Sequence, residues 1–411
     1  MRYVKATSVR QGLFLAVVFA SFGMLMACGG SSSSSSSSSN NMISTSGQNV
    51  QPITVNGGPV PNFVYENAAF TSVTLCAPGT TTCQTIDGIL VDTGSFGLRV
   101  LSSAVTLSLP TLGTGGSTVN DCVTFVDGSF VFGPVAQADV KLAGETASSI
   151  SLQMIENPTA YSVPASCANG GTNDDTLSAL GANGILGVGP EPEDCGPACD
   201  PSTGGASPPV PAYYACSTAA GCQPTFVSVA QQVTNPVVLF TTDNNGVIME
   251  LPSASGQEAS SSGSLVFGIG TQSNNQLPSS TALFRLDNED NFTTTLNGQA
   301  ITGSFLDSGS NALFFPDSSI PTCSDLTFFF CPTSTVSLTA TNTGTNGASN
   351  QVSFTVGNAD QMSGSDAVLP ALAGPNSAGF DWGLPFFYGR NVYTAIDGQS
   401  TPSGAGPYWA Y

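Results

Sequence analysis

Short segments in which apolar and polar residues alternate recur throughout the chain, and clusters of Gly, Pro, Asn and Asp separate them. A period of two is the pattern of β-strands with one buried face, and the intervening clusters are typical of turns. Stretches with the helical period of 3.6 residues are scarce, and residues 226–233 form the best short helix candidate. The pattern therefore predicts an all-β protein.

The two halves of the chain repeat the same order of predicted parts. Strands at 72–75 and 85–91 lead to Asp92, and strands at 292–296 and 299–302, joined by the hairpin dipeptide Asn297-Gly298, lead to Asp307. Later in each half an apolar segment ends at glycine, at 184–187 and at 380–384. Each of these alone is read as a core strand ending at Gly. As a repeated pair, they indicate segments that pack beneath the two Asp turns.

Each Asp stands in the same four-residue frame, Asp-Thr-Gly-Ser at 92–95 and Asp-Ser-Gly-Ser at 307–310. The chain is rich in Gly, Ser and Thr, so one such frame can arise by chance, whereas two in corresponding places indicate function. If the turns meet, their carboxyl groups share one proton, because two adjacent negative charges are unfavourable. Such a pair is both a general acid and a general base, which is the chemistry of peptide hydrolysis by an activated water.

The charged residues exclude several classes of function. The chain has no His, which excludes Ser-His and Cys-His nucleophilic catalysis and His-ligated metal sites. Only four bases follow the first 28 residues, against 27 acidic residues. This balance excludes nucleic acid and anionic lipid as partners of the folded surface. The excess of acidic residues is compatible with an enzyme that works below neutral pH. It is equally compatible with a surface that is acidic only for solubility.

The first 28 residues resemble a bacterial lipoprotein signal. Arg2, Lys5 and Arg10 precede an apolar stretch at 13–26, and Cys28 stands where such signals are cleaved and lipidated. The alternative is an ordinary secretory signal that contains a cysteine. Residues 29–59 begin with a Gly and Ser run and are predicted to be a flexible tether. We expect a lipid anchor in the bacterial cell envelope, at the outer rather than the inner membrane, because Gly29 is not the Asp of inner-membrane retention.

Without Cys28, the 11 cysteines leave an even number in an exported chain, where thiols oxidise. Spacing suggests four short local disulfide loops, which leaves Cys122 and Cys167 for each other. A metal site built from the four cysteines between 195 and 222 is the alternative, although they lack a tight Cys-x-x-Cys spacing. We therefore expect no metal and no cofactor. The predicted pairs are Cys76 with Cys83, Cys122 with Cys167, Cys195 with Cys199, Cys216 with Cys222, and Cys323 with Cys331.

Taken in order, these motifs resemble those of the pepsin-like aspartic peptidases. The match covers about residues 60–400 and includes the two Asp turns and the segments 183–189, 263–268 and 382–397. Within that group, residues 82–95 and 97–100 are most similar to an uncharacterised bacterial family of exported pepsin-like lipoproteins. The resemblance implies a bilobal, pepsin-like double β-barrel of lobes 60–270 and 271–411. An active-site cleft lies between the lobes in that fold, and the protein is expected to be a monomer.

The resemblance also implies roles for individual residues. Asp92 and Asp307 would hold the water that attacks a polypeptide substrate in the cleft. Thr93 and Ser308 would brace the turns against each other. The remaining turn residues would either hydrogen-bond the carboxylates or let backbone N–H groups approach them; these are Gly94, Ser95, Gly309 and Ser310.

The chain departs from the family on the substrate side. The expected flap, at 124–130, includes Asp127 and Gly128 and has Phe125 where a Tyr is usual. Arg99 replaces a common Trp, and Asp381 precedes the last glycine motif instead of following it. Residues 29–71 contain no Lys or Arg, so a basic prosegment that covers the dyad is not expected. The leading hypothesis is an aspartic endopeptidase, and its rival is a catalytically weak or inactive surface protein that uses the same cleft for binding.

Overall fold

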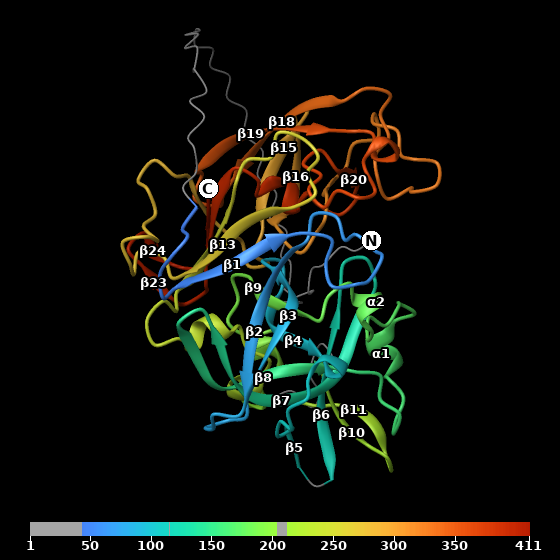
Figure 1. Ribbon diagram of the computed structural model, residues 1–411, viewed down its shortest axis with the longest axis vertical. Coiled ribbons are helices and arrows are strands. Elements are labelled where there is room, and N and C mark those ends of the chain that lie inside the picture. Colours follow the sequence, from blue (N-terminus) through green and yellow to red (C-terminus); the bar gives the residue numbers. More distant parts are fainter. Residues whose placement is uncertain (1–42, 115, 204–211) are drawn as a thin grey trace, which may run out of the picture.

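The computed structural model describes residues 43–114, 116–203 and 212–411, and it confirms that the protein is mainly β. Figure 1 shows two lobes, with the strands labelled β2 to β9 below and those labelled β15 to β20 above. The signal segment, most of the tether and Cys28 lie outside the described residues.

The first lobe is a closed barrel of six strands. Each strand pairs with the next, and β7 returns to pair with β2, so that Leu75 lies opposite Val140. The barrel is filled by Val, Leu and Ile side chains that point inward from alternate positions. In their order around the barrel, the strands are β2 (Ala69–Cys76), β3 (Cys83–Asp92), β9 (Gly184–Val188), β4 (Phe96–Leu101), β8 (Glu145–Ile155) and β7 (Phe130–Leu142).

The second lobe repeats this arrangement but stays open. Strand β9 lies between β3, to which it is parallel, and β4, to which it is antiparallel, and β21 lies in the same way between β16 and β17. The short β17 then pairs with β20 instead of β19, so the sheet does not close. The lobe is a half-barrel and not the second closed barrel that the resemblance implied. Its strands, in sheet order, are β19 (Ser349–Val356), β18 (Val336–Thr343), β15 (Phe292–Leu296), β16 (Gln299–Leu306), β21 (Asp381–Trp382), β17 (Leu313–Phe315) and β20 (Ala373–Pro375).

Further strands extend the barrel sheet beyond β2. They come from the beginning, the middle and the end of the described chain. They include strands from both sides of the expected lobe boundary near residue 270. They also include β1, which lies within the range 29–59 that we assigned to a flexible tether. Val50, Ile53 and Val55 of β1 are buried, which explains why this part of the range is ordered. In sheet order the strands are β1 (Val50–Val55), β13 (Ser261–Phe267), β12 (Gly246–Leu251), β22 (Arg390–Ala395), β25 (Tyr408–Ala410) and β14 (Leu283–Arg285).

The remaining elements are short. The helix predicted at 226–233 is wrong: this segment forms only a single 3-10 turn, η4 (Val229–Gln231). No helix among the described residues is long and apolar enough to cross a bilayer. The other elements are β5 (Gly113–Thr114), β6 (Ser117–Thr124), β10 (Tyr213–Ser217), β11 (Gly221–Pro224), β23 (Ser400–Thr401), β24 (Gly404–Ala405), α1 (Ala165–Ala168), α2 (Leu177–Leu180), η1 (Ser102–Ala104), η2 (Gly196–Cys199), η3 (Pro201–Thr203), η5 (Pro236–Leu239), η6 (Ala359–Gln361) and η7 (Leu384–Phe386).

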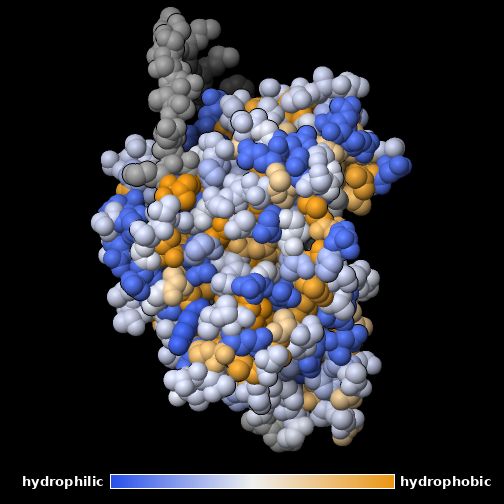
Figure 2. All heavy atoms as spheres, in the orientation of Figure 1, coloured by the Kyte–Doolittle hydropathy of each residue, from blue (hydrophilic) through white to orange (hydrophobic). Residues whose placement is uncertain are grey.

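All five predicted disulfides are confirmed, with the expected partners. The cysteines between 195 and 222 are therefore bound to one another in pairs and do not form the alternative metal site. Two of these bonds lie in the long insertion after β9, which also carries β10 and β11. On the face shown in Figure 2, polar residues cover most of the surface and apolar ones are scattered among them.

Candidate active site

The two Asp turns are placed by equivalent strands. Asp92 is the last residue of β3, and Asp307 directly follows β16. Beneath the first turn Gly187 of β9 pairs with Asp92, and beneath the second Trp382 of β21 pairs with Leu306. A Cβ on Gly187 would lie 2.7 Å from the backbone of Phe96, so only glycine lets this strand pass so close to the turn. The repeated apolar-Gly segments therefore do pack beneath the turns.

The structure brings the two predicted carboxyl groups together. A Cβ on Gly309 would lie 2.6 Å from Asp92 Oδ1 and 3.1 Å from Asp307 Oδ1. Likewise a Cβ on Gly94 would lie 2.6 Å from Asp307 Cγ. Each glycine thus makes room for the carboxyl of the opposite lobe, and the two acids are within hydrogen-bonding reach of each other.

Thr93 and Ser308 hold the two turns together by a reciprocal set of hydrogen bonds. The N–H of Thr93 donates to Ser308 Oγ at 3.1 Å, and the N–H of Ser308 donates to Thr93 Oγ1 at 3.0 Å. Each hydroxyl then donates across the lobes, from Thr93 to the carbonyl of Leu306 at 3.1 Å and from Ser308 to that of Val91 at 2.8 Å. Because all four bonds are buried, this contact fixes the separation of the two carboxyl groups.

The hydrogen bonds within each turn orient its carboxyl group. The N–H of Gly94 donates to Asp92 Oδ1 at 2.8 Å, and that of Gly309 donates to Asp307 Oδ1 at 2.8 Å. On the other oxygen, Ser95 Oγ donates to Asp92 Oδ2, and Ser310 Oγ lies 2.9 Å from Asp307 Oδ2. All the turn residues that the sequence singled out therefore lie in one site.

Burial and mutual repulsion determine how the pair ionises. Burial raises the pKa of Asp92, although the hydrogen bonds from Ser95, Asp307 and Gly94 and the charge of Arg99 oppose the shift. Burial raises the pKa of Asp307 well above its usual range, and the charges of Asp92 and Asp381 raise it further. Because two adjacent carboxyl groups do not both ionise easily, the pair shares one proton. The negative charge of Asp381 beside Asp307 and the positive charge of Arg99 beside Asp92 make a difference between the two sides that favours Asp307 as its holder.

Two charged residues that cause this difference were noted in the sequence only as departures from the family pattern. Asp381 is fully buried in β21, and its Oδ2 lies 2.7 Å from Ser310 Oγ on the Asp307 side. Arg99 is buried in β4 on the Asp92 side. No sequence signal placed either residue beside the dyad, because their roles depend on which strands become neighbours.

Arg99 is the centre of a buried ionic network. Its Nη2 lies 2.9 Å from Asp194 Oδ2 and 3.5 Å from Asp121 Oδ2, and its Nη1 donates to the carbonyl of Phe96. The hydroxyl of Tyr213 donates to Asp194 Oδ1 at 2.5 Å. Burial, followed by the charge of Asp194, raises the pKa of Asp121 well above its usual range. The network ties the strand after the first Asp turn to β6 and to the long insertion.

The segment predicted to be the flap lies at the turn between β6 and β7, and the ring of Phe125 is buried. The N–H of Phe125 donates to the carbonyl of Ser129 at 2.8 Å, and Gly128 has φ 85°, which closes the turn. The Phe125 side chain is 4% exposed and packs in the apolar cluster that contains Tyr65 and Leu90. Asp127 and Gly128 line a separate surface hollow with residues 169–172 and Asp174. Their proposed contact with substrate stays a prediction.

Both dyad residues are 0% exposed, so the site is closed in this structure. Beside the second turn, Asn67 from the loop between β1 and β2 joins the lobes. Its Nδ2 donates to the carbonyl of Asn311 at 2.8 Å, and its Oδ1 accepts from the hydroxyl of Tyr388 at 2.8 Å.

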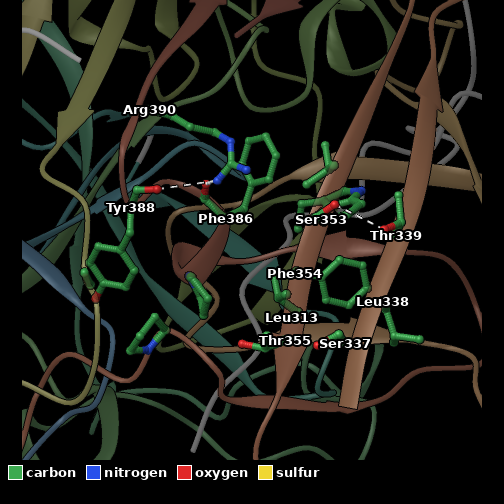
Figure 3. A pocket seen from close by; sticks show the side chains of 15 residues that line it. Leu313, Ser337, Leu338, Thr339, Ser353, Phe354, Thr355, Phe386, Tyr388 and Arg390 are labelled. Atoms are coloured by element: carbon green, nitrogen blue, oxygen red, sulfur yellow. Dashed lines mark hydrogen bonds between the residues drawn. The ribbon is translucent and has the colours of Figure 1, made fainter. Parts of the chain in front are cut away.

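A cavity of about 400 Å³ lies in the second lobe, and neither Asp92 nor Asp307 lines it. Figure 3 shows Thr339 and Ser353 of β18 and β19 on one side and Phe386, Tyr388 and Arg390 on the other. The guanidinium of Arg390 lies over the Phe386 ring, 4.5 Å from its centroid, and donates to the carbonyl of Tyr388 at 3.5 Å. Trp382, directly after Asp381, also lines this cavity, which therefore reaches beneath the second Asp turn without entering it.

Comparison with protein families gives a match that covers nearly all of the described chain. Residues 45–411 match the family described as "Protein of unknown function (DUF3443)", and the chain belongs to this family. No curated protein matches the chain. The family description assigns no chemistry, so any function has to be argued from the geometry of the site.

Proposed function

We propose that the protein is an aspartic-type endopeptidase of the pepsin-like kind, in which Asp92 and Asp307 activate a water molecule. One observation carries the proposal: two fully buried carboxyl groups from equivalent turns of two lobes lie within hydrogen-bonding reach and are fixed by the Thr93 and Ser308 bonds. Burying two acids together without a cation between them costs free energy, and acids with perturbed pKa values cluster at functional sites. The repeated strand arrangement around both turns supports the same proposal.

The mechanism follows from the way the pair ionises. The oxygen of the water attacks the scissile carbonyl carbon while Asp92 takes a proton from that water. Asp307 gives its own proton to the carbonyl oxygen. The product of this step is a tetrahedral diol, without a covalent bond to the protein. The diol then returns a proton to Asp307, Asp92 protonates the amide nitrogen, and the C–N bond breaks.

The alternative is a surface protein that uses the same fold for binding without hydrolysis. The closed site and the buried ring of Phe125 favour it, because both oppose entry of an extended peptide. A binding protein has no use for a shared proton between two acids, and for that reason we prefer the enzyme.

The test is digestion of an unfolded protein at acidic pH by the purified full-length chain. We expect cleavage that a statine-type inhibitor blocks and that Asp92→Asn and Asp307→Asn each reduce about 10²- to 10⁴-fold. Asp360→Asn, which removes an exposed acid on η6, is the matched control and should cleave like the wild type. Cleavage that is absent, or that persists in both dyad variants, would favour the binding protein.

The location of the protein stays part of the proposal. A lipid on Cys28 would hold the enzyme at the bacterial envelope, at the outer membrane by the sequence argument given above. Metabolic labelling with a palmitate analogue should mark the wild type and not Cys28→Ala. An unlabelled wild type would leave the ordinary secretory signal as the explanation.

A further inference from the structure

The two lobes differ at one buried position beneath the dyad. In the first lobe Ile185 of β9 pairs with Leu90, two residues before Asp92. In the second lobe Asp381 of β21 pairs with Phe305, two residues before Asp307. Ile185 is 1% exposed and belongs to an apolar cluster, whereas Asp381 is a carboxyl group that is 0% exposed. A core position that is apolar in one lobe therefore holds an acid in the other.

The Ser310 hydroxyl joins this extra acid to the dyad. Its Oγ lies 2.9 Å from Asp307 Oδ2 and 2.7 Å from Asp381 Oδ2. A hydroxyl group has one proton to donate, while two ionised carboxylates would both have to accept from it. One of the two short contacts is satisfied only if a carboxyl group is protonated and donates to Ser310 Oγ.

We infer that Asp381 is a positioning residue that shares a proton with Asp307 through Ser310. When the proton of Asp381 moves to Ser310 Oγ, the hydroxyl proton of Ser310 moves to Asp307, so Asp307 becomes protonated and Asp381 ionised. The number of protons in the site does not change. The exchange favours the protonated form of Asp307 at the start of the reaction, and the diol returns that proton to Asp307 at its end.

The charges around Asp307, Ser310 and Asp381 are consistent with a proton shared between the two acids. Among the described residues, the acids that act on Asp307 are Asp92 and Asp381, and both raise its pKa. The cation Arg99 acts on Asp92 and opposes the rise in pKa that burial causes there. The second lobe therefore favours the protonated acid and the first lobe the ionised base. Asp381 would set the upper pH limit at which Asp307 still holds its proton.

The test measures the proton directly and does not need activity. Infrared spectra of full-length protein with ¹³C-labelled aspartate report the protonated carboxylic acids as the pH is raised. We expect the pH at which the buried acid signal is lost to fall by about one unit in Asp381→Asn, because a nearby negative charge is removed. Asp381→Leu should show the same shift, and its apolar side chain, like Ile185, suits a core position. Asp360→Asn is the exposed control and should titrate like the wild type.

The role of Asp381 in hydrolysis rests on the proposed function, whereas the proton that it shares with Asp307 does not. If the wild type cleaves protein, the upper pH limit of kcat should fall by the same amount in both Asp381 variants. If the wild type cleaves nothing, the proposed function fails and the infrared titration alone decides about Asp381. An unchanged midpoint in whichever Asp381 variants fold overturns the inference in either case.

Discussion

Gly94 lies directly against the carboxyl group of Asp307, across the boundary between the lobes. A methyl group at this position would be 2.6 Å from Asp307 Cγ and 2.7 Å from its Oδ1, inside any normal contact distance. The backbone of Gly94 does not adopt a left-handed conformation. The site therefore needs glycine here because it has no side chain, and not because its backbone is flexible.

Gly94→Ala should therefore separate the two acids while the fold persists. We expect cleavage to fall about 100-fold, since a small displacement of catalytic groups is enough for such a loss. Stability should fall by about 1–3 kcal/mol, the usual cost of overpacking. Peptidase assays and thermal unfolding measure the two effects. Gly79→Ala is the control: Gly79 lies in an exposed turn with open space around it, and its positive φ predicts a small stability loss and unchanged activity.

The raised pKa of Asp307 predicts how stability varies with pH. A carboxyl whose pKa is higher in the folded state contributes stability that is complete below its unfolded pKa, near 3.8, and is lost as the pH rises through the folded value. Over that window the free energy of unfolding should fall by up to about 1.4 kcal/mol per pH unit for this group. Asp307→Asn should flatten the profile. Chemical unfolding at a series of pH values tests this, and equal slopes in the two proteins would contradict it.

Replacing Arg99 should destabilise the first lobe strongly. Arg99→Met leaves Asp194 and Asp121 buried without their cation, and breaking a buried ion pair in this way costs about 3–5 kcal/mol. Arg285 offers a matched control, because it lies over the Tyr408 ring and forms no ion pair with a carboxylate among the described residues. Arg285→Met should cost about 1 kcal/mol or less. Similar losses in the two variants, measured by thermal unfolding, would show that the network is not stabilising.

The Cys122–Cys167 disulfide should contribute more stability than the Cys195–Cys199 disulfide. The first spans 45 residues and the second only 4, and a longer closed loop restricts the unfolded chain more. Replacing the first pair with alanines should cost about 2–4 kcal/mol, and replacing the second pair should cost less. Calorimetry of the two double variants gives the order, and the reverse order would refute the loop-length explanation.

Local patterns in the sequence predicted the parts of the molecule that depend on a few adjacent residues. The Asp turns at 92 and 307 and four of the disulfides depend on such short-range signals, and the structure places the turns together and confirms the disulfides. The Cys122–Cys167 disulfide followed because its two cysteines were left over. Strand β1 escaped notice because the polar residues before it resemble a linker. Its ordering depends on β13, more than 200 residues away along the chain.

The half-barrel and the two charged neighbours of the dyad could not be predicted in the same way. Whether the second sheet closes depends on which strand pairs with the three residues of β17, and no local propensity decides that. Asp381 and Arg99 were visible as unusual residues in the motifs. Their burial, and the acids around them, follow only from the packing of separate strands.

The reciprocal bonds of Thr93 and Ser308 make the chemistry of the site a property of the whole fold. Each lobe brings one acid and one bracing hydroxyl, so a half-finished chain with only its first lobe in place has no working pair. Under the proposed function, a chain still being synthesised would therefore have no hydrolase activity, although residues 29–71 contain no Lys or Arg with which to cover the dyad.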